Sequence, residues 1–207
     1  MNRRERRIMK VIYMMRHSEP LKCNNIENND SLQLQNEKWT LTKNGENIAK
    51  EKSKIEELQN FDIVFSSNYV RAIATAKYFT PDKVNVIESF GERKLGIEKW
   101  EDKPENFEKR QFEDFNYKLK DGESLNEVMD RELKSLYNIL NDFPDKKILI
   151  VGHATALATL FSKWCNVSFS DYRFNGVQFF DGNFDYCETF KLTFSDNNEL
   201  LNIEHVI

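Results

Sequence analysis

Short apolar runs alternate with longer amphipathic segments along most of this chain of 207 residues. Apolar runs bounded by polar residues are typical of buried strands. Four such runs lie at 10–15, 62–67, 83–90 and 146–153. The segments between them place an apolar residue at every third or fourth position, as helices do. The predicted helices cover 43–58, 68–79, 124–143 and 154–165. This alternation predicts an α/β fold, a three-layer sandwich in which helices flank a mainly parallel central sheet.

The predicted helix at 124–143 has the clearest boundaries. Ser124 stands at its start and Glu127 follows three positions later, which is the spacing of a capping box. Pro144 comes directly after it and cannot continue a helix. Both ends of this helix are therefore predicted from side-chain chemistry as well as from periodicity.

Near the C-terminus the pattern changes to alternating apolar and polar residues. The alternating segments are 176–180, 188–194 and 200–207. The turn-forming residues SDNN separate the last two segments, which predicts a C-terminal antiparallel hairpin. An edge strand in such a hairpin would allow a homodimer without requiring one. His205 falls in the last strand and is predicted to be an edge residue.

Two segments depart from the pattern. Residues 20–39 are polar and show no period, so we expect a long loop, and long loops in compact domains are often functional. Residues 98–121 are crowded with charged and aromatic side chains, which predicts a partly helical, cap-like excursion over a cleft. No linker or repeat divides the chain, so we predict a single domain over 1–207. Residues 1–8 are predicted to be a disordered extension before a start at Met9, because the apolar run is too short for a signal peptide.

Composition narrows the possible partners. The formal net charge of −4 argues against nucleic acid or an anionic membrane as the main partner. No stretch approaches the ~20 apolar residues that span a bilayer. The three cysteines, Cys23, Cys165 and Cys187, form no C-x-x-C pair. Free thiols in a reducing compartment are the simplest interpretation, so a cytoplasmic location is expected.

Candidate catalytic residues lie at the ends of the predicted strands. Ligands of such folds bind beyond the carboxyl ends of the strands. Arg16 and His17 end the first strand, His153 ends the fourth, and Arg71 lies in the first turn of the helix after the second. Paired guanidinium donors suit a phosphate group, and a neutral histidine can attack phosphorus. The residues therefore predict a site for a small-molecule phosphate ester, with a nearby carboxyl group needed to protonate the leaving alcohol.

Six short motifs appear in a fixed order in this chain. They are RHSE at 16–19, LTKNGENIAK at 41–50, SSNYVRAIATA at 66–76, ERKLG at 92–96, DGESL at 121–125 and VGHAT at 151–155. Together they closely resemble those of the histidine phosphatase superfamily, the phosphoglycerate-mutase-like proteins. The resemblance implies that His17 is the phosphorylated nucleophile and that Glu92 is the general acid. It also implies that Arg16, Arg71 and His153 bind the phosphate group, with no metal and no cofactor.

Three functions remain open at this point. The first is a phosphomonoester hydrolase that acts on a small phosphorylated metabolite through a phosphohistidine intermediate. The second is a phosphoglycerate mutase, which would share the site. The third is a non-catalytic regulatory module that binds a phospho-ligand. A mutase of this kind needs basic groups that bind a doubly phosphorylated substrate. Residues 98–121 contain more acidic than basic residues, which favours the hydrolase.

The chain also offers alternatives for individual roles. Ser66 and Ser67 end the second strand, and either can support the site with a hydrogen bond. Three other carboxyl groups lie near Glu92 and compete with it for the role of the acid: Glu88, Glu98 and Glu101.

Overall fold

A computed structural model describes residues 9–23, 30–168 and 170–206 of the chain. The extension expected at 1–8 and part of the loop expected at 20–39 lie outside these residues. Among the described helices, none has the length and apolar character needed to cross a membrane.

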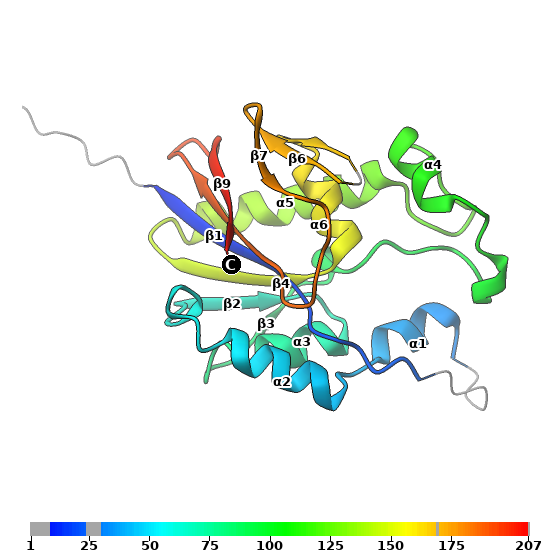
Figure 1. The fold of residues 1–207 in the computed structure, drawn as a ribbon, viewed down its shortest axis with the longest axis horizontal. Helices are drawn as coiled ribbons and strands as arrows, with labels where there is room; N and C mark the ends of the chain where they lie inside the picture. The colour runs from blue at the N-terminus through cyan, green and yellow to red at the C-terminus, as the bar shows by residue number, and fades with distance from the viewer. Residues whose placement is uncertain (1–8, 24–29, 169, 207) are drawn as a thin grey trace, which may run out of the picture.

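A six-stranded sheet forms the middle of the molecule, with the strand order β3-β2-β4-β1-β8-β9 (Figure 1). The first four strands in this order run parallel, and β8 and β9 join antiparallel to β1. The bounds are β1 Lys10–Arg16, β2 Ile63–Ser66, β3 Asn85–Val86, β4 Lys147–Gly152, β8 Thr189–Phe194 and β9 Leu200–Val206. The predictions of a mainly parallel sheet and of a C-terminal antiparallel hairpin are thereby confirmed.

Helices cover both faces of this sheet (Figure 1). On one face lie α2, Lys43–Lys52, and α3, Val70–Ala76. On the other lie α5, Leu125–Asp142, and α6, Ala154–Phe161. The three layers of the predicted sandwich are therefore present.

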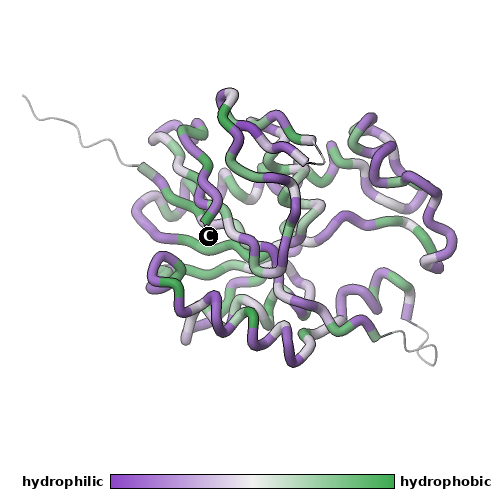
Figure 2. The backbone as a smooth tube through the Cα atoms, viewed as in Figure 1, coloured by the Kyte–Doolittle hydropathy of each residue, from purple (hydrophilic) through white to green (hydrophobic). Residues whose placement is uncertain are grey.

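Strand periodicity explains why both faces of the sheet are apolar. Ile12 and Met14 pack into one buried cluster with α5 and α6. Tyr13 and Met15 alternate with them and pack into a second cluster with α2 and α3. Because both sets are buried, β1 reads as a continuous apolar run instead of an alternating one. Figure 2 shows the apolar residues concentrated along the central strands.

The capping box predicted for the long helix forms at the start of α5. The Glu127 amide donates to Ser124 Oγ over 3.2 Å, and the Ser124 amide donates to Glu127 Oε2 over 2.8 Å. The helix ends at Asp142, two residues before Pro144.

A second, three-stranded antiparallel sheet packs beside α6 and was not predicted as a separate sheet (Figure 1). Its strands are β5 Asn166–Val167, β6 Tyr172–Phe174 and β7 Val177–Phe180. Aromatic rings fill the space between the two sheets around Phe190. His205 lies on the edge strand β9 as expected, but it is half-buried. It pairs with Glu188, and its ring stacks on Phe190 with 5.4 Å between centroids.

Several predicted boundaries were wrong. The segment expected to be a loop at 20–39 contains a helix, α1, Leu32–Lys38, which begins where Ser31 accepts a hydrogen bond from the Leu34 amide. The strand expected at 83–90 shortens to β3, and a 3-10 turn, Glu88–Phe90, takes its second half. The helix expected at 43–58 stops at Lys52 and is followed by a 3-10 turn, Glu56–Leu58. A side-chain cap starts α1, whereas 3-10 turns without a side-chain cap follow α2 and β3.

The segment 98–121 is partly helical, as predicted. It contains a 3-10 turn, Trp100–Asp102, and the helix α4, Phe107–Glu113. In Figure 1, α4 and α1 lie at the same end of the molecule, beyond the central sheet.

Replacing Phe190 by alanine should destabilise the fold by about 3–5 kcal/mol, because it removes a fully buried ring from the aromatic cluster. Urea unfolding followed by circular dichroism measures this change. Leu201→Ala is the matched control on the neighbouring strand, because Leu201 is 49% exposed, and it should shift the free energy of unfolding by less than about 0.5 kcal/mol. Equal effects of the two substitutions would contradict this description of the core.

Candidate active site

Three neighbouring strands place their following residues side by side at one edge of the sheet. The His17 amide donates to the Gly152 carbonyl over 2.9 Å, directly before His153. The Ser67 amide donates to the Val151 carbonyl over 3.0 Å. The order β2-β4-β1 therefore brings Ser67, His153 and His17 together, because parallel strands end at the same edge.

The hydrogen bonds of His17 define its tautomer. Its Nδ1 lies 2.6 Å from the Ser18 carbonyl oxygen, which can only accept, so Nδ1 carries the proton. Its Nε2 accepts from Arg71 Nε over 3.0 Å. Burial lowers the pKa of His17 well below its usual value, and the cations of Arg71 and Arg16 lower it as well. His17 is therefore a neutral imidazole whose lone pair faces the centre of the site.

His153 is a second neutral imidazole, fully buried. Its Nδ1 lies 3.4 Å from Arg71 Nη2, and its Nε2 lies 2.8 Å from Ser67 Oγ. Guanidinium groups only donate, so Nδ1 accepts and Nε2 donates to the serine. Burial lowers the pKa of His153 well below its usual value, and the neighbouring His17 and Arg71 act in the same direction. The two imidazole rings lie edge to face, with 5.0 Å between centroids.

Arg71 joins the two histidines through one guanidinium group. Besides its bonds to His17 and His153, its Nη1 donates to the Asn36 carbonyl of α1 over 2.5 Å. Its guanidinium lies 4.6 Å from the centroid of the Tyr69 ring. The residue is only 4% exposed, and burial lowers its pKa. Hydrogen bonds and an aromatic face therefore contact this charge directly, and the Glu92 carboxylate acts on it from a distance.

Arg16 brings a second cation to this edge. Its Nη1 donates to the Phe184 carbonyl, and its guanidinium lies 4.7 Å from the centroid of the Tyr186 ring. Its Nε is buried and has no hydrogen-bond partner among the described residues. A buried donor of this kind is costly unless an acceptor meets it, and an anion would supply that acceptor.

The side chain of Glu92 reaches the N-terminus of α6, two residues after His153. Its Oε2 accepts from the Thr155 amide over 3.3 Å, and its Oε1 accepts from the Arg93 amide over 2.8 Å. A carboxylate at a helix N-terminus meets free amide groups there. The other candidate acids take exposed positions: Glu88, Glu98 and Glu101.

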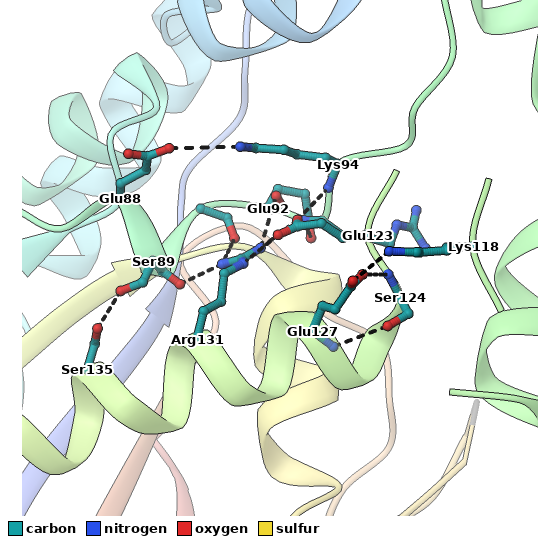
Figure 3. A network of polar contacts seen from close by, with 12 residues as sticks. Glu88, Ser89, Glu92, Lys94, Lys118, Glu123, Ser124, Glu127, Arg131 and Ser135 are labelled. Atoms are coloured by element: carbon teal, nitrogen blue, oxygen red, sulfur yellow. Dashed lines mark hydrogen bonds and ion pairs between the residues drawn. The ribbon is translucent and has the colours of Figure 1, made fainter. Parts of the chain in front are cut away.

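Arg131 of α5 supports the segment that carries Glu92 (Figure 3). Its guanidinium donates to the carbonyl groups of Ser89 over 2.5 Å and of Gly91 over 3.0 Å. Glu123 holds it in turn with two hydrogen bonds of 2.9 and 3.0 Å. Such a bidentate pair fixes an arginine in both position and orientation. Arg131 therefore positions the backbone on which Glu92 stands.

The structure brings all five predicted site residues to one place, and sequence reasoning missed several others. Ser67 was anticipated as a supporting residue. Arg131, Asn36 and Phe184 were not, and the last two act through backbone carbonyls, which leave no signal in the residue type. Glu123 stands inside the DGESL motif, so the motif marked its position but not its role.

Positive charge and neutral imidazoles dominate the centre of the site. Among the described residues, no group of three or more His, Cys, Asp or Glu side chains could hold a metal ion. The negative charge of Glu92 opposes the effect of burial on both arginines. The arrangement suits an oxyanion that accepts several hydrogen bonds at once.

A family model describing the histidine phosphatase superfamily, branch 1, matches residues 12–199. The chain belongs to this superfamily. The resemblance drawn from the ordered motifs is therefore confirmed. A search of curated proteins gave no match.

Solved structures of other proteins share the superfamily fold. A mycobacterial glucosyl-3-phosphoglycerate phosphatase superposes with a TM-score of 0.67 at 18% identity, covering 96% of this chain and 96% of that one. A phosphoserine phosphatase variant from Entamoeba histolytica, in complex with phosphoserine, gives 0.65 at 18% identity, covering 94% and 96%. A candidate α-ribazole-5′-phosphate phosphatase from Escherichia coli gives 0.65 at 18% identity, covering 95% and 96%. At this identity the likeness shows the fold alone.

A buried carboxyl group near this site should make stability depend on pH. Glu132 of α5 is 1% exposed, and its Oε2 has no hydrogen-bond partner among the described residues. Burial raises the pKa of Glu132 to about 8, although the Arg131 cation acts in the opposite direction. The folded protein thus keeps a proton that the unfolded chain releases once the pH exceeds about 4.5. This stabilising contribution is complete below that pH and is lost as the pH rises toward 8.

The free energy of unfolding of the wild type should therefore fall relative to that of Glu132→Gln by about 1.4 kcal/mol per pH unit between about pH 5 and pH 7.5. Urea titrations at several pH values measure the two curves. Asp130→Asn, on an exposed position of the same helix, is the control and should run parallel to the wild type. A Glu132→Gln curve that is also parallel would contradict the raised pKa.

Proposed function

We propose that the protein is a phosphomonoesterase that hydrolyses a small phosphorylated metabolite through a phosphohistidine at His17. The observation that carries the proposal is the neutral His17, whose Nε2 lone pair faces a guanidinium at the strand edge. A neutral nitrogen can attack phosphorus, and two neighbouring cations can hold the phosphate group. The superfamily and the phosphatase names of its structural relatives support this reaction class.

In the first step, His17 Nε2 bonds to phosphorus while the bond to the leaving oxygen breaks. Glu92, which takes up a proton from solvent when the anionic ester enters the site, gives that proton to the leaving oxygen, so the product leaves as a neutral alcohol. In the second step, Glu92 takes a proton from water, the water oxygen bonds to phosphorus, and the bond to Nε2 breaks. Inorganic phosphate is released, and both residues return to their starting forms.

Arg71 must turn away from Nε2 before that atom can attack. Its guanidinium then meets the phosphate oxygens, together with the unpartnered Nε of Arg16. His153 can join them after a change of tautomer. Ser67 Oγ can donate to Nε2 as well as accept from it, which leaves Nδ1 free to carry a proton toward the phosphate. The arginines supply the charge that a metal ion supplies in other phosphoryl-transfer sites.

A cytoplasmic location is part of the proposal. It rests on the three cysteines, which are unpaired in the structure.

Replacing His17 by alanine should lower phosphate release at least about a thousand-fold, because the nucleophile is lost. Release is measured on a panel of phosphomonoesters that includes 3-phosphoglycerate, between about pH 5 and pH 8 and in excess chelator. His205→Ala is the matched control, since the ring of that histidine pairs with the Glu188 carboxylate and stacks on Phe190 instead of on a proposed catalytic residue, and it should keep activity within a few-fold of the wild type. Full activity of the His17 variant would overturn the proposal, and isomerisation of 3-phosphoglycerate would favour the mutase. Loss of activity in chelator would contradict the role given to the arginines.

Replacing Arg131 by methionine should slow esters of poorly leaving alcohols by about 10- to 100-fold in kcat, with little change in KM. Arg131 holds the Glu92 segment and makes no hydrogen bond to a proposed phosphate-binding residue in the part of the chain that the structure describes, so the proton donor is displaced while the phosphate group still binds. The leaving group of 4-nitrophenyl phosphate departs without being protonated, so kcat for this ester should change little. Glu92→Gln should likewise slow the esters of poorly leaving alcohols and spare 4-nitrophenyl phosphate. An equal loss on both kinds of ester would mean that Arg131 only stabilises the fold.

A further inference from the structure

A cavity of about 470 Å³ adjoins the candidate active site. It lies between α6, α4 and the second sheet. Two of its lining residues also touch the catalytic group. The amide of Thr155 donates to Glu92, and the carbonyl of Phe184 accepts from Arg16. A group bonded to the oxygen that Glu92 protonates can therefore extend past Thr155 into this cavity, although Glu92 itself lines a second cavity beside Lys94 and Arg131.

The walls of the cavity are mainly apolar. They are formed by small or hydrophobic side chains of α6, α4, β5 and β6: Ala154, Ala158, Phe112, Val167 and Tyr172. A concave site of this volume with aromatic walls suits a small organic group. Hydroxyl groups of Thr155 and Ser168 also line the cavity and give it a few polar contacts.

The charged groups at the cavity neutralise each other. Lys109 and Glu113 of α4 both line it, and Lys109 Nζ lies 3.7 Å from Glu113 Oε1. Among the described lining residues, Lys109 is the cation, and the carboxylate beside it offsets its charge. A second phosphate or a carboxylate on the substrate would meet no net positive charge here and would lose its hydration against mainly apolar walls.

Buried polar contacts hold α4 at a fixed place relative to Glu92. Arg93, the residue after Glu92, is 7% exposed, and its Nη1 donates to Gln111 Oε1 of α4 over 2.6 Å. Gln111 Nε2 donates in turn to the carbonyl groups of Tyr117 and Glu123. The cavity wall and the proton donor are thus tied together, so the width of the cavity limits what is attached to the leaving oxygen.

We infer that the substrate is a monophosphate ester of an alcohol that carries an apolar ring and no second anionic group, with the ring bound in this cavity. The inference rests on the proposed hydrolysis at His17. A ring bound in this cavity disfavours the mutase reaction, since a second anionic group placed there would meet no net positive charge.

The test compares three esters of primary alcohols: benzyl phosphate, 4-carboxybenzyl phosphate and ethyl phosphate. Benzyl and 4-carboxybenzyl alcohol have similar reactivity and differ by one carboxylate. We expect kcat/KM for benzyl phosphate to exceed that for either of the others by about ten-fold or more. His17→Ala should abolish all three reactions.

Two variants test whether the ring, and the carboxylate attached to it, bind in the cavity. Phe112→Ala should lower kcat/KM for benzyl phosphate about ten-fold, so that most of the preference for benzyl over ethyl phosphate is lost. Glu113→Gln, an exposed substitution, should free Lys109 and raise kcat/KM for 4-carboxybenzyl phosphate several-fold without changing that for benzyl phosphate.

The outcomes separate the two proposals. His17-dependent hydrolysis with no preference for benzyl phosphate, or with a preference for the carboxylated ester, would overturn the inference and leave the proposed function standing. A Glu113→Gln variant that behaves as the wild type on all three esters would also overturn it. No hydrolysis of any ester by the wild type would overturn the proposed function and the inference with it.

Discussion

The parallel pairing of β1 with β4 is the constraint on which the site depends. Arg16 of β1 lies opposite Gly152 of β4 in the register, so the next residue of each strand is a histidine at the same level. Both strands are buried on both faces, which leaves the register no freedom to slip. A slip of one residue would exchange the side chains of β1 between the two buried clusters and separate His17 from His153. The packing of the core therefore also fixes the relative positions of the two histidines.

Burial has two consequences at this edge. It keeps both imidazoles neutral in the company of cations, and it leaves the guanidinium groups with few partners. Arg71 forms hydrogen bonds with the two histidines and with the Asn36 carbonyl of α1. In the proposed reaction, an incoming phosphate group would replace these bonds, so its binding would require Arg71 to move relative to α1. Arg71 is thus satisfied within the protein, whereas the Nε of Arg16 is a donor that an anion could accept from.

Sequence reasoning succeeded where one residue type carries the signal. Apolar runs marked β1 and β4, and the histidines after them followed from the edge rule for parallel sheets. It failed where the information lies in the backbone or in tertiary context. Arg131 occupies one polar position among many on α5, and only the fold shows that it faces the Glu92 segment. The helix α1 was missed because its hydrophobic pattern is weak. Its start depends on the cap at Ser31, which accepts a hydrogen bond from the Leu34 amide. The second sheet was missed because its strands have two to four residues each, too few for a period to be seen.

Trapping the covalent intermediate tests the central claim most directly. A fast-turnover ester is mixed with the enzyme, the reaction is quenched with alkali within one turnover, and the peptides are analysed by mass spectrometry. The account predicts one phosphoryl group on the peptide that contains His17, stable in alkali, lost in acid, and absent from His17→Ala. Turnover without any phosphoryl enzyme, or with phosphate on another residue, would contradict it.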